Sequence, residues 1–209
     1  MNIIKPYIEL EGKIDGTAML KKIERIGRVC YKSENNITEE SCERFIHNIL
    51  KRGHESVIEH VSISVRVICD RGVTHEIVRH RMASYSQEST RYCNYCNEKF
   101  GEELTFIKPC YWDENCEQYM HWKKCMASIE ETYNALIKSG ATPQEARSIL
   151  PNSLKTEIVM TMNLREWRHF FKLRCAKASH PDMRKVAYMI LDEFKSKIPV
   201  VFDDIVKIM

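Results

Sequence analysis

Apolar residues recur at intervals of three and four over much of this chain, a pattern typical of amphipathic helices. Together with capping residues, it predicts helices over 15–30, 38–53, 73–80, 116–139, 142–151, 163–175 and from 181 onward. Asp15, Thr38 and Asn163 are the expected N-caps of three of these helices. Thr142-Pro143-Gln144-Glu145 predicts a capping box with proline at the first helical position.

The hydrophobic pattern predicts fewer strands than helices. Apolar and polar residues alternate strictly over 61–69, which predicts a half-buried strand. Shorter apolar runs predict strands over 104–107 and 156–162, whereas residues 82–99 are polar and aperiodic. Three widely separated strands favour an antiparallel or mixed sheet over a βαβ series. The sequence therefore predicts a predominantly helical α+β fold, with one domain over 1–209.

The charge balance and the length of the apolar runs limit the kinds of molecule that this protein is expected to bind. The 209 residues include 32 basic and 29 acidic side chains, a net charge of +3, which argues against a general nucleic-acid or membrane binder. No apolar run reaches the length of a membrane-spanning helix, and the N-terminus lacks the pattern of a signal peptide. We therefore expect a cytoplasmic protein.

The nine cysteines are expected to be reduced thiols in such a compartment. Cys93 and Cys96 form a C-x-x-C, but a structural zinc site normally needs a second such pair or closely spaced histidines. The later cysteines are irregularly spaced. Packing is therefore the favoured role, with a zinc site or a redox motif as the alternatives, and we expect no metal.

Residues 79–92 concentrate hydrogen-bond donors, with three arginines, one histidine and four Ser or Thr hydroxyls but no glycine. Guanidinium groups bind phosphate bidentately and stay charged at any working pH. Arg79 and Arg81 flank His80 at the predicted end of a short helix, so they should project in different directions. The chain has no G-x-G-x-x-G and no Walker loop. The segment therefore predicts an anion or nucleotide site of another kind, with a solvated loop as the alternative.

Arg79-His80-Arg81, followed after seven residues by Ser89, resembles the R-H-R-x7-S signature of the flavin-dependent thymidylate synthases. Four further segments are similar to motifs of that family, in the same order. They are Gly53-His54-Glu55-Ser56 with Glu59-His60, Ala146-Arg147 with Leu150-Pro151, Asn163-Leu164-Arg165, and Leu173-Arg174. Five ordered matches are far more specific than a lone R-H-R.

The resemblance implies methylation of dUMP to dTMP without a cysteine nucleophile. Methylenetetrahydrofolate would supply the carbon, reduced FAD would supply the hydride, and NADPH would reduce the flavin. The resemblance also implies a homotetramer whose active sites each draw residues from several subunits.

The resemblance also assigns roles to individual residues. FAD contacts are expected from His54, Ser56, Arg79, His80, Arg81, Gln87, Asn163, Arg165 and His169. Contacts to dUMP are expected from Glu76, Ile77, Val78, Arg79, Gln87, Glu88, Ser89, Thr90, Arg91, Arg147 and Arg174. Arg91 and Arg147 would bind the phosphate, and Arg174 would be catalytic by stabilising negative charge on the uracil ring. Two positions depart from the family pattern: Glu76 replaces a common glutamine, and Gln87 replaces a frequent glutamate.

Simpler roles stay open for several of these residues. Arg174 could merely neutralise a helix C-terminus, and Asn163 could be only an N-cap. Ser89 has no evident general base, so we interpret it as a nucleotide ligand rather than a nucleophile.

A nucleic-acid-binding protein is the alternative from another functional class. Its phosphate ligands would be arginines 79, 81, 91 and 165, and tyrosines 85, 92 and 95 would stack bases. The small net charge counts against it.

Overall fold

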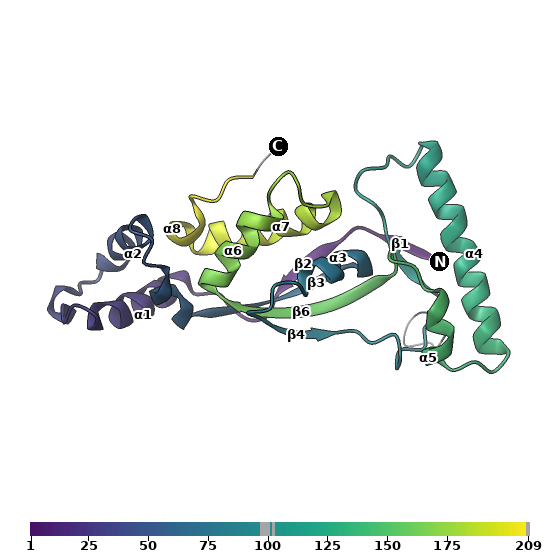
Figure 1. Ribbon diagram of the computed structural model, residues 1–209, viewed down its shortest axis with the longest axis horizontal. Helices are drawn as coiled ribbons and strands as arrows, with labels where there is room; N and C mark the ends of the chain where they lie inside the picture. Colours follow the sequence, from purple (N-terminus) through teal and green to yellow (C-terminus); the bar gives the residue numbers. More distant parts are fainter. Residues whose placement is uncertain (97–100, 102, 208–209) are drawn as a thin grey trace. The chain divides into compact units, whose positions relative to one another are not determined.

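The computed structural model describes residues 1–96, 101 and 103–207 (Figure 1). The helices are α1 (Gly16–Val29), α2 (Ser41–Lys51), α3 (Arg71–Ile77), α4 (Glu117–Lys138), α5 (Pro143–Ala146), α6 (Leu164–Arg174), α7 (Pro181–Lys197) and α8 (Pro199–Phe202). Short 3-10 helices are η1 (Glu34–Asn36), η2 (Glu55–His60) and η4 (Arg147–Ile149). The strands are β1 (Asn2–Ile4), β2 (Tyr7–Leu10), β3 (Ser62–Asp70), β4 (Ser84–Gln87), β5 (Thr105–Ile107) and β6 (Lys155–Asn163). This mixture confirms the predicted α+β class, and none of the described helices is long and apolar enough to cross a membrane.

Most helix ends follow from the capping residues in the sequence. The Asp15 side chain accepts from the Ala18 amide at 2.9 Å, and the Asn163 side chain accepts from the Glu166 amide at 2.9 Å. Gly140, with φ +99, follows α4 in the left-handed conformation that glycine tolerates best. These predicted boundaries are confirmed.

Thr38 is not the N-cap of α2, so that prediction is wrong. The helix begins at Ser41 because the Thr38 amide donates to Ser41 Oγ at 2.9 Å, while the Ser41 amide donates back to the Thr38 carbonyl. Thr38 therefore lies in a turn before the helix.

The helix α3 also differs from the prediction. It starts at Arg71, capped by Asp70, and it ends at Ile77. Arg79, His80 and Arg81 therefore follow the helix instead of forming its last turn.

Three strands escaped the prediction because they are only three or four residues long, too short to show a clear period. β1 pairs in parallel with β5, and the register places Asn2 opposite Thr105. The four-stranded sheet has the order β2-β3-β6-β4, so the unpredicted strands β2 and β4 form its edges. Edge strands are often polar, as Ser84-Tyr85-Ser86-Gln87 is here. β4 lies in the segment 82–99 that we expected to be irregular, and residues 97–99 of that segment fall outside the described residues.

The chain forms two compact units, and each contains three segments. Unit 1 comprises Met1–Tyr7, Val67–Arg79 and Ser86–Val159. Unit 2 comprises Ile8–Arg66, His80–Tyr85 and Met160–Met209. The central strands β3 and β6 contribute residues to both units. A single domain over 1–209 stays a prediction.

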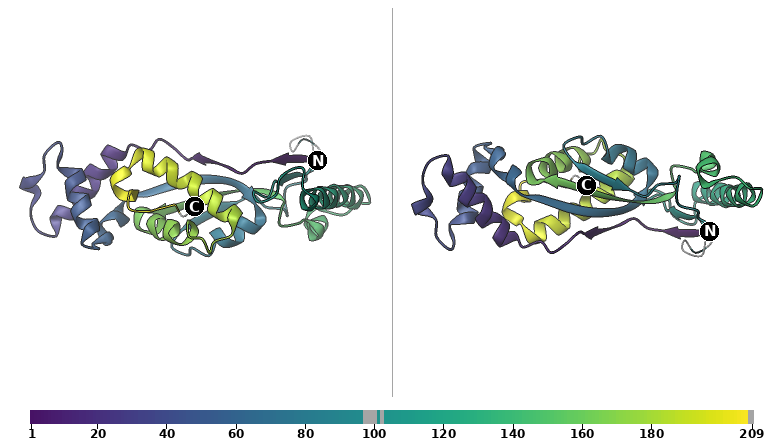
Figure 2. Two further views of the ribbon diagram at one scale, coloured as in Figure 1. Left: turned by 90° about the horizontal axis from the view of Figure 1, so that it is seen from above. Right: turned by 90° about the horizontal axis from the view of Figure 1, so that it is seen from below.

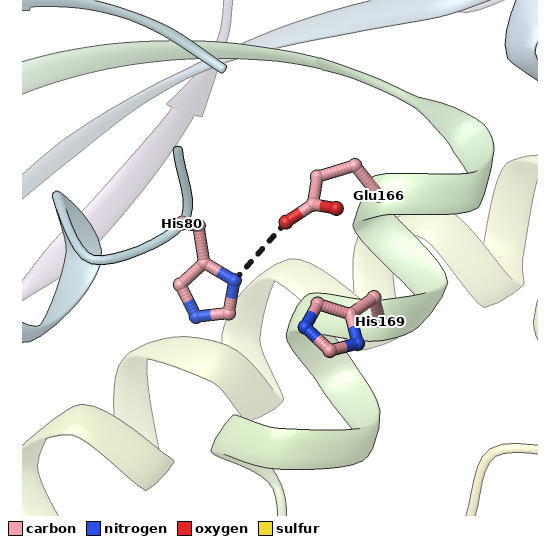
Figure 3. Close-up of side chains that lie close together, drawn as sticks. All are labelled: His80, Glu166 and His169. Carbon is pink, nitrogen blue, oxygen red and sulfur yellow. Dashed lines mark hydrogen bonds and ion pairs between the residues drawn. The ribbon is translucent and has the colours of Figure 1, made fainter. Parts of the chain in front are cut away.

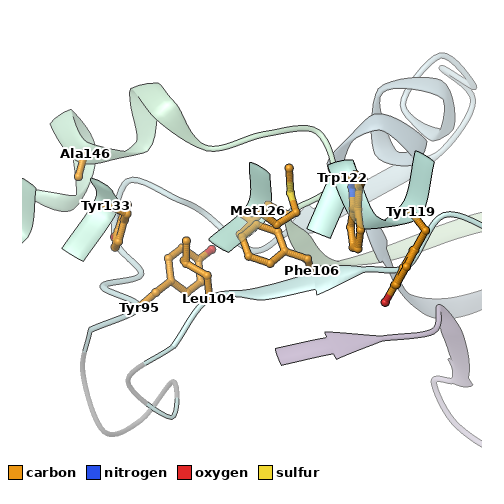
Figure 4. Packing of buried hydrophobic residues seen from close by; sticks show 9 residues of the cluster. Tyr95, Leu104, Phe106, Tyr119, Trp122, Met126, Tyr133 and Ala146 are labelled. Carbon is orange, nitrogen blue, oxygen red and sulfur yellow. The ribbon is translucent and has the colours of Figure 1, made fainter. Parts of the chain in front are cut away.

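Unit 1 has an aromatic core on the inner face of α4 (Figure 4). Its buried members are Tyr95, Leu104, Phe106, Tyr119, Trp122, Met126, Tyr133, Ala146 and Leu154. Cys93, Cys96 and Cys116 are partly buried against this cluster. The cluster supports the packing interpretation for these three thiols.

Unit 2 has its core between α6, α7 and α8, and α6 and α7 lie side by side (Figure 2). Trp167, Phe171, Phe194 and Phe202 are fully buried there, with the Trp167 and Phe194 rings packed edge to face at 4.9 Å. Elsewhere in the unit, a Cβ at Gly27 would lie 2.8 Å from the Phe45 ring, so α1 and α2 can approach this closely only with glycine at that position.

A buried arginine ties α6 to the segment after α8. The Arg168 side chain is 3% exposed and binds the Asp204 carboxylate bidentately, with both contacts at 2.7 Å. It also donates to Glu55 Oε1 at 3.1 Å and to the Val201 carbonyl. Because the Arg168 guanidinium is buried and bound bidentately, removing one member of this group of contacts is expected to destabilise the fold.

Replacing Arg168 with alanine should lower the free energy of unfolding by about 3 kcal/mol, because Glu55 would be left without its buried partner. The loss should stay near the lower end of the usual range, since the Asp204 side chain is 60% exposed and can be rehydrated. Urea unfolding at a fixed protein concentration measures this difference. Arg25→Ala, at an exposed position of α1, is the matched control and should change stability by less than about 0.5 kcal/mol. Equal unfolding midpoints for the two variants would contradict the assignment.

Candidate functional site

The residues expected to contact ligands divide between the two units. Unit 1 holds those expected mainly at dUMP, namely residues 76–79, 87–91 and Arg147. Unit 2 holds His54, Ser56, His80, Arg81, Asn163, Arg165, His169 and Arg174, which are mostly the expected flavin contacts.

Unit 2 contains a pocket of about 460 Å³ along α6. Its lining residues are Glu55, Glu59, Met82, Asn163, Arg165, Glu166, His169 and Lys172. Residues 165, 166, 169 and 172 recur at the three- and four-residue spacing that puts side chains on one helix face. The pocket thus brings together three predicted flavin contacts: Asn163, Arg165 and His169.

Five lining residues were not predicted, and three of them are carboxylates. Glu59 accepts from Arg165 at 2.6 Å, and Glu55 lies 3.6 Å from the Lys172 ammonium group. The pocket therefore offers cationic donors that now bind carboxylates.

The His80 side chain is 3% exposed and contacts Glu166, which lines the pocket. Figure 3 shows His80 together with Glu166 and His169. Its Nδ1 lies 3.3 Å from Glu166 Oε1, and its Nε2 accepts from Arg174 Nε at 3.0 Å. Burial, reinforced by the nearby Arg174 cation and by His169, lowers the pKa of His80 to about 4. The imidazole is therefore neutral near pH 7.

Tyr85 of β4 holds the backbone at His80. Its hydroxyl donates to the His80 carbonyl at 2.7 Å. Burial raises the pKa of Tyr85 to about 12, so the phenol keeps its proton and remains a donor. An edge strand that the sequence did not predict thus helps to position the histidine of the R-H-R motif.

His80, Glu166 and His169 also have the chemistry of metal ligands. Their ligand atoms lie within 4.8 Å of one another. Imidazoles and carboxylates bind divalent cations such as zinc. The Arg174 guanidinium, however, already donates to the His80 ring, and its positive charge opposes a metal ion at this place.

In unit 1, several contacts fix the segment after β4. The Glu88 carboxylate accepts from the Tyr95 hydroxyl at 2.7 Å and from Lys155 at 3.0 Å, and the Glu88 amide donates to the Glu157 carbonyl. Ser89 Oγ accepts from the Arg91 amide at 3.3 Å, which stabilises a tight turn.

The same segment brings Arg91 to α5. Arg91 Nε donates to Gln144 Oε1 at 2.9 Å. Gln144 is the second residue of α5 and Arg147 directly follows the helix, so their three-residue spacing puts them on one face of this turn. Arg91 and Arg147 are both exposed, and together they form a cationic surface suited to a phosphate.

The side chains of two other expected dUMP contacts, Ile77 and Gln87, are buried or already hydrogen-bonded within the protein. The Ile77 side chain is 0% exposed, so it can contact a ligand only through its backbone. The Gln87 amide donates to Thr74 Oγ1 at 3.1 Å and to Thr156 Oγ1 at 3.3 Å. The Thr74 hydroxyl donates its own proton to the Arg71 carbonyl at 2.8 Å, so it requires a donor such as this amide rather than a glutamate.

Three expected flavin contacts of unit 2 lie apart from the pocket lining. His54, Ser56 and Arg81 are exposed and do not line it. The structure therefore gathers only part of the expected set in a single chain.

Comparison with known sequences identifies relatives. The family model described as thymidylate synthase complementing protein matches residues 14–200. A flavin-dependent thymidylate synthase of Pyrococcus furiosus is 40% identical over 167 residues, which are 79% of this chain and 68% of that protein. The protein of that name from Geobacter sulfurreducens is 32% identical over 184 residues, with coverages of 85% and 78%.

Comparison with solved structures gives the same picture of the fold. The crystal structure of a UMP/dUMP methylase from Streptomyces cacaoi, bound with 5-Br dUMP, has a TM-score of 0.77 to this chain. The match covers 97% of this chain and 96% of that one, at 22% sequence identity, so it is evidence for the fold alone. The extent of the family match and the identity to the two relatives confirm the resemblance drawn from the motifs, and the chain belongs to the flavin-dependent thymidylate synthase family.

Proposed function

We propose that this protein methylates dUMP to dTMP, with methylenetetrahydrofolate as the carbon donor and FAD, reduced by NADPH, as the source of hydride. The observation that carries the proposal is the setting of Arg174. Its guanidinium is held by a buried, neutral imidazole, and that imidazole contacts Glu166 of the unit 2 pocket. A fixed cation of this kind is what charge developing on a uracil ring requires.

The residues of the unit 2 pocket are suited to an anionic dinucleotide such as FAD. The side-chain oxygen of Asn163 caps α6, and the NH2 group of the same side-chain amide can donate to a ligand. Arg165 offers further guanidinium donors to a pyrophosphate beside the one that binds Glu59. We propose that Asn163, Arg165 and His169 hold part of the flavin cofactor, which when bound supplies the hydride.

Arg91 and Arg147 are the proposed ligands of the dUMP phosphate. Two guanidinium groups can neutralise a phosphate dianion and bind it bidentately, which a lysine cannot do. Ser89 and the backbone of Glu88 and Thr90 complete the proposed ligand set. The Glu88 amide already donates to the Glu157 carbonyl, so Glu88 would reach the phosphate through a bridging water.

Arg174 is the proposed catalytic residue. As C5 of uracil attacks the one-carbon unit, negative charge grows on the O2–N3–O4 edge, and a planar guanidinium can meet two atoms of that edge. The Phe170 ring contacts His80, with centroids 4.9 Å apart, and provides apolar surroundings that strengthen the field of the cation.

Two buried thiols support a reaction without a cysteine nucleophile. Burial raises the pKa of Cys175 to about 11, and it also raises the pKa of Cys69. Thiols in such surroundings stay protonated at neutral pH and are poor nucleophiles.

We also propose a cytoplasmic homotetramer with shared active sites. In support, His54, Ser56 and Arg81 are exposed and outside the pocket, where a second copy of the chain could complete the flavin site.

The direct test of this function is anaerobic incubation of the protein with dUMP, methylenetetrahydrofolate, FAD and NADPH. We expect dTMP to form, and we expect the purified protein to be yellow and to release flavin on denaturation. A colourless protein that makes no dTMP with added FAD would contradict the proposal. Polynucleotide affinity that falls steeply with salt would then favour the nucleic-acid alternative.

Arg174→Lys tests the catalytic assignment. Lysine keeps the positive charge but loses the planar fork, so we expect kcat for dTMP formation to fall on the order of 10²–10³-fold. NADPH oxidation without dUMP should persist, because that step needs only the flavin site. Single-turnover flavin oxidation and dTMP formation measure the two steps separately. Wild-type dTMP formation by Arg174→Lys would show that Arg174 is only a helix-end cation.

Arg147→Ala provides the contrast. Loss of one phosphate contact should raise the KM for dUMP about ten- to hundredfold and leave FAD binding unchanged. An unchanged KM for dUMP in Arg147→Ala would contradict the phosphate assignment.

A further inference from the structure

Glu166 lies in the unit 2 pocket, and the proposed function gives it no role. Its Oε1 is 3.3 Å from His80 Nδ1, and its side chain is 14% exposed. On the opposite side of the same ring, His80 Nε2 accepts from Arg174 Nε at 3.0 Å. The three side chains therefore form a continuous chain of hydrogen bonds from the carboxylate to the guanidinium (Figure 3 shows the carboxylate end).

The proton positions in this chain follow from the donors and acceptors. A guanidinium can only donate, so His80 Nε2 must carry a lone pair. A neutral imidazole with a lone pair on Nε2 has its proton on Nδ1. That proton faces the Glu166 carboxylate, which can accept it. Glu166 therefore stabilises the tautomer of His80 that Arg174 requires.

The geometry of α6 supports this arrangement. Glu166, Phe170 and Arg174 are spaced by four residues, so they follow one stripe of the helix. Glu166 and Arg174 are about 12 Å apart along the helix axis. The His80 ring bridges them, and its edge-on contact with the Phe170 ring, at an interplanar angle of 61°, restrains its tilt.

We infer that Glu166 is a positioning residue for Arg174: it holds the proton on His80 Nδ1, keeps Nε2 as an acceptor, and so fixes the plane of the guanidinium. The inference rests on the proposed function, in which Arg174 acts on the uracil ring. The cap of α6 is a separate matter, because it uses the backbone amide of Glu166. Replacing the side chain therefore leaves the cap in place.

Substitutions of Glu166 test the inference through turnover. Glu166→Ala should lower kcat for dTMP formation about tenfold, the scale of one lost hydrogen bond to a charged group, with a smaller change in the KM for dUMP. Glu166→Gln keeps an oxygen that accepts from His80 Nδ1 and should restore activity to within about threefold of wild type. Glu193→Ala, an exposed glutamate of α7 beside Lys197, is the matched control and should leave kcat unchanged.

A double-mutant cycle separates positioning from a general structural effect. If Glu166 acts through Arg174, Glu166→Ala should cost no more than about twofold in the Arg174→Lys background. A tenfold loss in both backgrounds, or in neither, would overturn the inference. Should Glu166→Ala fail to fold, Glu166→Asp serves in the same cycle, because it keeps the charge and withdraws the oxygen by one methylene. A wild-type protein that makes no dTMP rejects the proposed function itself, whereas an active wild type with a fully active Glu166→Ala rejects only the positioning role.

Discussion

Arg174 donates its Nε–H to Nε2 of His80, and this bond sets demands that the surrounding residues meet. The imidazole has to be neutral with a lone pair on that nitrogen, which burial and the adjacent guanidinium enforce by lowering the His80 pKa to about 4. The remaining ring proton then needs an acceptor, and Glu166 supplies it. Tyr85 fixes the backbone of the same residue from β4. The hydrogen bond from Arg174 thus requires the neutral, Nδ1-protonated form of His80, and the burial and the partners of this residue favour that form.

One helix carries both the core of unit 2 and most of its candidate site. Trp167 and Phe171 on α6 are fully buried, and the Arg168 side chain ties the helix to the segment after α8. Residues 165, 166, 169 and 172 on the other face line the pocket. Because core packing fixes the helix, the pocket side chains and Arg174 keep a constant spacing. This rigidity is what a preorganised cation needs.

The sequence predicted the elements whose signal is local. The alternation over 61–69 and the caps at Asp15 and Asn163 gave β3, α1 and α6 nearly to the residue. β2 and β4 were missed because four residues are too few to show a clear period. The cap prediction at Thr38 was wrong because Thr38 and Ser41 bond to each other in a turn before the helix. At the site, motif resemblance predicted roles for His169 and Arg165, which the structure places in the unit 2 pocket. It gave no role to Glu166, whose partner His80 is 86 residues away in sequence. No local pattern reports a contact of that range or the burial of a histidine.

The measurement that tests this account most directly is 15N NMR of the histidine-labelled protein, which reports the protonation of each ring nitrogen. We predict that His80 stays neutral from about pH 7.5 to about pH 5.5, with a proton on Nδ1 and a bare Nε2, because its pKa lies near 4. The Glu166→Ala variant should shift the proton toward Nε2. An imidazolium at neutral pH, or a proton on Nε2 in the wild type, would contradict the hydrogen-bonded chain from Glu166 to Arg174.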